Sequence, residues 1–226
     1  MKKMTMIQAA LLTSIVVIGL GATDAQAATS APTGTTTSGV WAVVTKNGAV
    51  PLAPGAIHMT PPPKNTPKAK QSTGGATPFL LDPGASFMCL TVGEEGLDIR
   101  DYDFYWNGGT QSISLLCGTS AYGYRHIMNE HEGDWEAVQR AAGDSGADYS
   151  WDDLMSNGIE ASITYPTWIT GPDSSNKFCG ESSLAWFPNG DPNSTPTYVQ
   201  RVETIRSNNN KTVITSFPIT PTAPGC

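Results

Sequence analysis

Hydrophobic and polar positions divide the chain into three parts. An apolar run lies near the start, residues 28–78 are poor in apolar side chains, and regular apolar spacing begins near position 79. The middle part is rich in Thr, Ser, Ala, Gly and Pro, and has too little apolar surface to repay the entropy of ordering. We therefore expect a largely disordered linker over 28–78, with a short strand at 40–44 that docks on the domain. One globular α+β domain is expected over 79–226.

Strands are predicted where apolar or β-branched residues are grouped, or where they alternate with polar ones. Three such segments, 87–92, 101–106 and 113–117, lie in the first part of the domain. Near the end, the segments 197–205 and 211–217 alternate in the same way, with an asparagine-rich turn between them. These last two segments form the strongest predicted hairpin in the sequence.

Two segments have helical features instead. An apolar stripe with helical spacing runs over residues 120–142, and Gly133 is expected to divide it into two helical pieces. A second, shorter helix is predicted to start at Ser150, where the sequence resembles a capping motif with acidic residues in the first turn. Gly158 is expected to end this second helix.

Residues 1–27 have the three-part pattern of a secretory signal peptide. Lys2 and Lys3 form the positive start, an apolar run follows over 7–20, and Ala-Gln-Ala at 25–27 is a small-x-small cleavage site. The apolar run contains polar residues and is too short to span a bilayer comfortably. We expect a protein that is secreted to the extracellular space and has no membrane span.

The charge balance argues against a broad surface for nucleic acid. Removal of residues 1–27, which contain Lys2, Lys3 and Asp24, leaves 11 basic and 19 acidic residues and a net charge of −8. Phosphate backbones are bound mainly through clustered lysines and arginines, which this composition does not favour. A small local phosphate site remains compatible with it.

The four cysteines, Cys89, Cys117, Cys179 and Cys226, are an even number in a chain expected to be exported, which favours two disulfides. Three connectivities are open, and order along the chain suggests Cys89–Cys117 and Cys179–Cys226. A metal site formed by the cysteines fits poorly, because no two of them lie within a few residues of each other.

Two of the three histidines, His126 and His131, lie in the densest polar patch of the domain. An imidazole takes or gives a proton near neutral pH, and the adjacent Arg125 has the chemistry to stabilise a phosphate charge. On a regular helix the two histidines point about 140° apart, with His131 nearer the apolar side. Two simpler interpretations stand beside acid–base catalysis: His126 pairs with Glu130 on a solvated face, or His131 is partly buried against Trp135.

Metal ligation by this patch fits less well. Zinc motifs on one helix place two histidines four residues apart, or leave two residues between the first histidine and a glutamate. Three residues separate His126 from Glu130. A metallohydrolase is therefore disfavoured, and no cofactor is expected.

Two segments also resemble a known group of proteins. The first is Gly-Tyr-Arg-His-Ile at 123–127, followed by His131 and Trp135, and the second is Thr-Val-Ile-Thr-Ser-Phe-Pro at 212–218. The pattern, over residues 118–218, is similar to secreted bacterial toxin domains of the broad barnase/EndoU/colicin/RelE-like ribonuclease group. The resemblance implies an α+β fold in which N-terminal helices precede a small antiparallel sheet, here stabilised by disulfides. It also implies metal-independent cleavage of RNA by transesterification, which leaves a cyclic phosphate.

The resemblance also implies roles for individual residues. His126 would be the general base or acid, and Arg125 would hold the phosphate. Thr215 would contact the phosphate or orient His126, His131 matches the second histidine, and Tyr198 would contact the substrate. The implied partners are RNA and an inhibitor protein, and a monomer is expected. This hypothesis predicts that His126, Arg125 and Thr215 converge in one cleft.

The alternative hypothesis is a non-enzymatic binding domain, secreted or associated with the cell envelope. Its support is the Pro/Thr-rich stretch before the domain and three aromatic residues expected to be exposed: Tyr102, Tyr105 and Trp106. It predicts a flat aromatic patch and an isolated His126.

Overall fold

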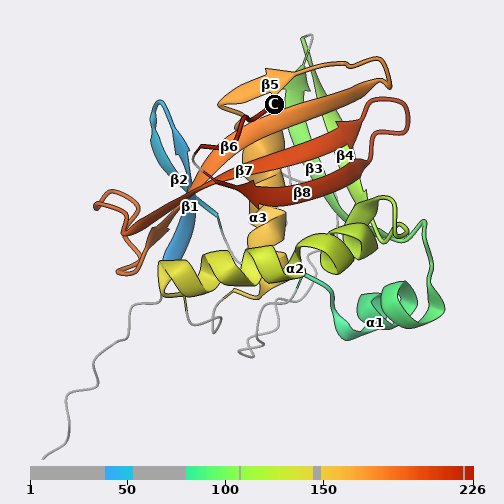
Figure 1. The fold of residues 1–226 in the computed structure, drawn as a ribbon, viewed down its shortest axis with the longest axis horizontal. Helices are drawn as coiled ribbons and strands as arrows, with labels where there is room; N and C mark the ends of the chain where they lie inside the picture. The colour runs from blue at the N-terminus through green and yellow to red at the C-terminus, as the bar shows by residue number, and fades with distance from the viewer. Residues whose placement is uncertain (1–38, 53–79, 107, 145–148, 221) are drawn as a thin grey trace, which may run out of the picture. The chain divides into compact units, whose positions relative to one another are not determined.

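One antiparallel sheet contains most of the strands of the domain (Figure 1). The computed structural model describes residues 39–52, 80–106, 108–144, 149–220 and 222–226, which all belong to one compact unit, Thr36–Cys226. Within this part of the chain the sheet has the order β2-β1-β6-β7-β8, and β5 pairs with β6 as a sixth strand. The strands are β1 (Val40–Thr45), β2 (Gly48–Leu52), β5 (Trp168–Thr170), β6 (Lys177–Phe187), β7 (Tyr198–Ser207) and β8 (Val213–Ile219).

The remaining elements are a separate two-stranded hairpin and the helices. The hairpin pairs β3 (Asp98–Trp106) with β4 (Gly109–Leu116). Two long helices, α2 (Gly123–Ala142) and α3 (Trp151–Thr164), follow it in the chain. A short α1 (Pro83–Ser86) and the π-helix η1 (Phe87–Val92) precede it.

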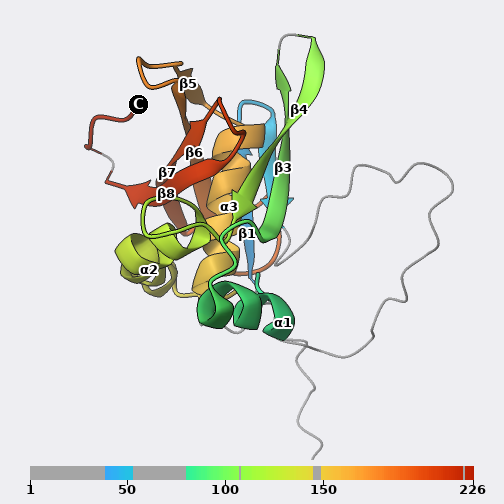
Figure 2. The same ribbon diagram turned by 90° about the vertical axis from the view of Figure 1, so that its right-hand side faces the viewer.

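Helix α3 lies between the main sheet and the β3–β4 hairpin (Figure 2). Residues 152–163 are all buried, including several polar ones, so each layer has to supply hydrogen-bond partners. On the hairpin side, Arg100 donates to Ser156 and to Glu160, both at 2.8 Å. On the sheet side, Ser162 donates to Thr204 at 2.5 Å. The helix starts as predicted, because Ser150 and Asp153 form a complete capping box.

Helix α2 packs along β8, which is an edge strand of the sheet. The indole Nε1 of Trp135 donates to the main-chain carbonyl of Ser216 at 3.3 Å. An uncovered edge strand would present unpaired backbone groups to other chains, and α2 covers part of this edge. The helix is continuous through Gly133, which contradicts the predicted interruption. The buried residues of the helix provide the reason, since packing against the domain outweighs the local cost of one glycine.

The predicted fold order, with N-terminal helices followed by a small sheet, is wrong. The structure is mainly β, and β1 and β2 precede every helix among the described residues. Strand β1 pairs with β6 in the middle of the sheet, from Val40 opposite Phe187 to Val43 opposite Leu184. Trp41 and Val43 are fully buried there, so an early segment supplies part of the core. The expected docking of residues 40–44 as a strand is confirmed.

The predicted strand at 87–92 is also wrong, because these residues form η1. Asp82 caps the preceding turn by accepting from the backbone N–H of Ala85 at 2.8 Å, and Pro83 stands at a favoured first helical position. Gly93 ends the helical stretch in the left-handed conformation, with a φ of 79°. These flanking signals outweigh the apolar run between them.

Helix α3 does not end at Gly158 as predicted, but continues to Thr164. A Cβ atom at position 158 would collide with the ring of Trp135. The glycine therefore allows close approach of α2 and α3 and is not a helix terminator.

The predicted strands at 101–106 and 113–117 correspond to β3 and β4, and the terminal hairpin corresponds to β7 and β8. The two disulfides are Cys89–Cys117 and Cys179–Cys226, the pairing suggested by order along the chain. Residues 1–27 and most of 28–78, assigned to the signal peptide and the linker, lie outside the described residues. Within the described part of the chain, no helix is long and apolar enough to cross a membrane.

Candidate active site: a histidine pair on α2

The first turns of α2 are held firmly against the end of β4. The backbone N–H of Arg125 donates to the carbonyl of Cys117 at 3.0 Å, and Cys117 forms a disulfide with Cys89. Gly118 has a φ of 69°, and a Cβ there would collide with the carbonyl of Tyr122. The turn is therefore tight, and it sets where the side chains of the first helical turns begin.

His126 is fixed by a backbone carbonyl in this turn. Its Nδ1 lies 2.9 Å from the carbonyl oxygen of Ser120. A carbonyl oxygen can only accept, so Nδ1 donates and carries the proton. Nε2 is then the ring atom that can exchange a proton with another molecule. The bond to Ser120 also means that His126 does not take Glu130 as the partner of its Nδ1, as one simpler interpretation had it.

His131 is fixed in the same manner, but by a carboxylate. Its Nδ1 lies 3.1 Å from Oδ2 of Asp134, three residues further along the helix. Its ring packs against Phe217 of β8, with ring centroids 5.0 Å apart and planes inclined by 31°. The side chain is 23% exposed, so part of it can be reached from solvent. Its aromatic neighbour is thus Phe217, where Trp135 was expected.

The two imidazoles are close to each other. Their ring centroids are 6.2 Å apart and their planes are nearly perpendicular, at 88°. On a regular helix such as α2, their spacing of five residues predicts that the two histidines point about 140° apart and do not meet. The angle between the Cα positions does not decide the distance, because each ring extends well beyond the helix backbone and is directed by its own hydrogen bond.

Thr215 lies on the same side of β8 as Phe217, because alternate residues of a strand share a face. The N–H of Ser114 on β4 bonds to the carbonyl of Lys211, which lies just before β8. Because the end of β4 also adjoins the start of α2, the first residues of β8 lie on the side of the first turns of α2, which carry His126. Thr215 precedes Phe217 on β8 and is therefore offset from it toward this side. Its Oγ1 is buried and has no hydrogen-bond partner among the described residues, so it is not bonded to either histidine.

Arg125 has its hydrogen-bond partner in the turn that precedes α2. Its Nη1 lies 3.4 Å from the carbonyl of Gly118, on the side of Gly93. Among the described residues, this guanidinium makes no contact with either imidazole.

Tyr198 is also remote from the pair. Phe217 pairs with Glu203 on β7, and Tyr198 is five residues before Glu203, roughly 17 Å along the strand. Its hydroxyl donates to Gln200 at 2.9 Å, and its ring packs edge-on against Trp41 at 6.4 Å. Among the predicted site residues, the structure therefore brings together His126 and His131 and places Tyr198 away from them, while Arg125 and Thr215 have no described contact with either ring.

Comparison with protein-family models, with curated proteins and with solved structures found no match. The resemblance to toxin ribonucleases therefore continues to rest on the two short segments named above. The chemistry of the site has to be argued from its own geometry.

Three participants of the site were missed by sequence reasoning. Asp134 follows His131 at a spacing of three, which brings side chains together on a helix and was a usable signal. Ser120 contributes a backbone carbonyl, for which a sequence has no residue-type signal. Phe217 comes from a distant strand, and only the packing of α2 on β8 identifies it.

Within the described residues, one group of three ligand-type side chains lies close enough to share a metal ion, and it is at the Cys179–Cys226 disulfide. On the other side of α2, burial raises the pKa of Glu132, with Glu136 and Asp152 adding to the shift.

Proposed function

We propose that this chain is an endoribonuclease that cleaves RNA by acid–base transesterification, with His126 and His131 as its two proton-transfer groups. One observation carries the proposal. Two imidazoles lie with ring centroids 6.2 Å apart, and each is held through Nδ1 by an oxygen acceptor. Both Nε2 atoms are thereby left for the substrate.

The reaction needs one base and one acid at the same phosphate. One imidazole accepts the proton of the ribose 2′-hydroxyl, and O2′ forms a bond to phosphorus. The bond from phosphorus to O5′ breaks, and the leaving oxygen takes a proton from the second, protonated imidazole. Each nitrogen has to come within about 2.6–3.2 Å of its oxygen. Two neighbouring imidazoles suit attacking and leaving oxygens that belong to one phosphate. The products are a 2′,3′-cyclic phosphate and a free 5′-hydroxyl.

The two rings differ in the acceptor that holds them. His131 is held by the carboxylate of Asp134, and His126 is held by a backbone carbonyl. Either ring can act as the base while the other acts as the acid. Thr215, whose hydroxyl is buried, would orient His126, and Arg125 would reach the phosphate after leaving Gly118.

The test is an RNA cleavage assay in excess EDTA with the wild type, His126→Ala, His131→Ala and Asn129→Ala. Asn129 is exposed on the same helix and serves as the matched control. Loss of one acid–base group is expected to slow cleavage by about 10²- to 10⁴-fold, and the control should retain wild-type activity. A DNA strand with a single ribonucleotide should be cut only after that ribonucleotide, with a cyclic phosphate detected by mass spectrometry. A folded wild type without activity, or full activity in His126→Ala, would refute the proposal.

One observation favours a binding role as the second candidate. Four large apolar side chains of η1 are exposed, with Phe87 at 57% and Val92 at 54%. Apolar side chains grouped on a surface often mark interaction sites. The predicted aromatic patch fits less well, because Tyr102 is buried and bonds to Ser156, although Tyr105 is 74% exposed. Co-sedimentation with bacterial cell envelopes, lost in a Phe87→Ser and Leu90→Ser double variant, would support this role.

A further inference from the structure

The two disulfides of the domain differ in their surroundings. Cys89 and Cys117 are both fully buried. Cys179 and Cys226 are half-buried and line a pocket of about 540 Å³, together with Lys177 and Asp173. A small reductant can therefore reach the second disulfide and not the first, since thiol–disulfide exchange requires access to a sulfur atom.

A carboxylate lies directly beside the accessible disulfide. One ligand atom from each of Cys179, Glu203 and Cys226 lies within 4.8 Å of the other two. Glu203 is half-buried and forms no hydrogen bond or ion pair among the described residues. Glu181, which faces it across β6 and β7, is bonded to Arg201 instead. Glu203 is thus a partly desolvated carboxylate, and the nearby Arg201, whose charge lowers the pKa of Glu203, is hydrogen-bonded to Glu181.

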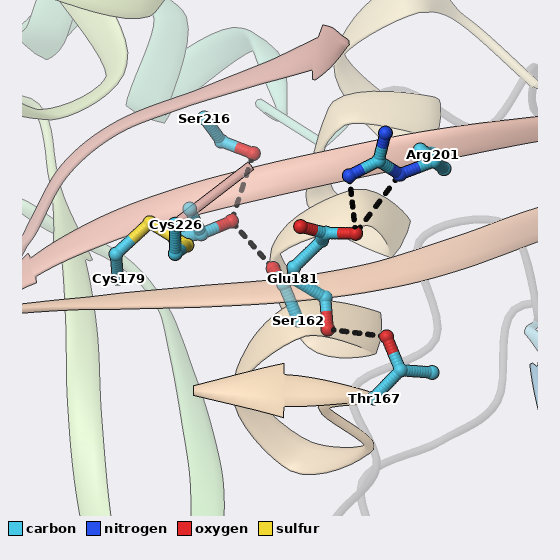
Figure 3. Close-up of a disulfide and its surroundings, with 8 residues drawn as sticks. Ser162, Thr167, Cys179, Glu181, Arg201, Ser216 and Cys226 are labelled. Carbon is cyan, nitrogen blue, oxygen red and sulfur yellow. Dashed lines mark hydrogen bonds and ion pairs between the residues drawn. A yellow bond between two sulfur atoms is a disulfide. The ribbon is translucent and has the colours of Figure 1, made fainter. Parts of the chain in front are cut away.

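The segment that carries Cys226 has an anchor besides the disulfide, and it involves Arg201, which Figure 3 shows paired with Glu181. Arg201 binds Glu181 through two nitrogens, at 2.7 and 2.9 Å, and donates to the carbonyl of Ala223 at 3.2 Å. These contacts hold residues 222–226 near the sheet when the bond between the sulfurs is broken. The two thiols would then remain beside Glu203.

We propose that reduction converts this disulfide into a site for a zinc-type divalent cation, with Cys179, Cys226 and Glu203 as ligands. A dithiol reductant supplies two electrons and two protons, and is itself oxidised to a disulfide. Both cysteine thiols then lose their protons to solvent as the cation binds. A tetrahedral zinc ion with bonds of about 2.3 Å to sulfur and about 2.0–2.2 Å to oxygen fits a trio of this size once the sulfurs separate. The fourth position is left for water.

The irregular segment can absorb the required movement. Cys179 is fixed on β6, paired opposite Ile205, whereas residues 222–226 have no regular secondary structure. In the oxidised protein the C-terminal segment is held by a covalent bond, and in the reduced protein it is held by the cation. This inference is independent of the proposed ribonuclease activity.

The first test maps the reducible bond. The full chain is treated with limiting dithiothreitol, alkylated and digested, and the peptides are identified by mass spectrometry. Labels are expected on Cys179 and Cys226, with Cys89 and Cys117 still joined. If Cys89–Cys117 opens first, or if both open together, the inference is overturned.

The second test titrates the selectively reduced chain with Co²⁺ as a spectroscopic substitute for zinc. One equivalent should produce a sulfur-to-cobalt charge-transfer band, which added Zn²⁺ removes. Glu203→Gln keeps the disulfide and hence the fold, and should weaken the affinity at least tenfold, about the effect of losing even an outer-shell partner. Asp173→Asn, a carboxylate change in the same pocket, should leave the affinity unchanged. No band, or equal affinity in Glu203→Gln, would rule the site out.

Discussion

The ring of Trp135 on α2 fills the space next to Gly158 on α3, where a Cβ atom would collide with it. The same indole donates to the carbonyl of Ser216 on β8. One side chain thus joins both long helices and the edge of the sheet. This contact therefore helps to hold α2, the helix that carries His126 and His131, against the sheet.

We expect Gly158→Ala to lower the free energy of unfolding by about 1–3 kcal/mol, because the added methyl group overpacks the contact with Trp135. Urea unfolding followed by fluorescence measures this change. Gly133→Ala is the matched control, since a Cβ there meets nothing within 4 Å. The control should gain about 0.5–1 kcal/mol from better helix propensity. Equal effects of the two substitutions would contradict the tight packing at Gly158.

Asp153 is expected to make stability depend on pH. Burial raises its pKa from the usual 3.8 to about 6, against the lowering effect of its hydrogen bonds with Ser150. A group whose pKa is raised by folding contributes stability below its unfolded pKa, and that contribution is lost as the pH rises through the folded pKa. The loss should therefore fall between about pH 4 and pH 6.

Asp153→Asn removes this titration and keeps an oxygen that can accept from the N–H of Ser150. Relative to the wild type, the variant should gain stability between about pH 4 and pH 6, by up to about 3 kcal/mol. Urea unfolding of both proteins across pH 4–8 measures the difference, and other titrating groups cancel in it. A difference that stays constant over this range would show that Asp153 titrates normally.

Arg100 and Glu160 form a buried ion pair at 2.8 Å between β3 and α3, with side chains only 5% and 7% exposed. Glu160→Gln should lower the free energy of unfolding by about 3–5 kcal/mol, because the guanidinium stays buried without its counter-charge. The double variant Arg100→Met, Glu160→Met should lose much less, since no unpaired charge remains. If the double variant is as unstable as Glu160→Gln, packing and not charge dominates this contact.

Thr215 is expected to separate stability from activity. Its buried Oγ1 has no partner among the described residues, so Thr215→Val should stabilise the fold by about 1 kcal/mol or more. If the hydroxyl orients His126, the same variant should cleave RNA more slowly. The matched control is Thr212→Val, which removes a 2.8 Å hydrogen bond to Asn210 and should destabilise the protein. A Thr215→Val variant that is less stable than the wild type would contradict this assignment.

Local signals predicted several elements correctly. Ser150 and Asp153 predict the start of α3, and the alternation of polar and apolar residues predicts β7 and β8. Both signals are local, because capping and pleating act between residues that are close in the chain. The spacing of His131 and Asp134 belongs to the same class of information. The helical stretch that includes η1 also has local signals, namely the cap Asp82 before it and Gly93 after it. The apolar run between them favours a strand instead, and the caps prevail.

Other features depend on contacts between distant parts of the chain. The order of helices and sheet was mispredicted because β1 inserts beside β6, and the composition around residues 40–52 does not show that pairing. Helix α3 does not end at Gly158, because this glycine packs against Trp135 and the helix continues beyond it.

The residues that are available for chemistry can be read from the sequence: two histidines close together in the chain, and four cysteines. The sequence also predicts that His126 and His131 lie on a helix, because the apolar stripe and its spacing are local properties. The meeting of the two rings, the bond of Arg125 to Gly118 and the remote place of Tyr198 follow from the folded structure alone. Side-chain directions are set by packing and by hydrogen bonds to Ser120, Phe217 and Gly118, and no periodicity encodes these contacts.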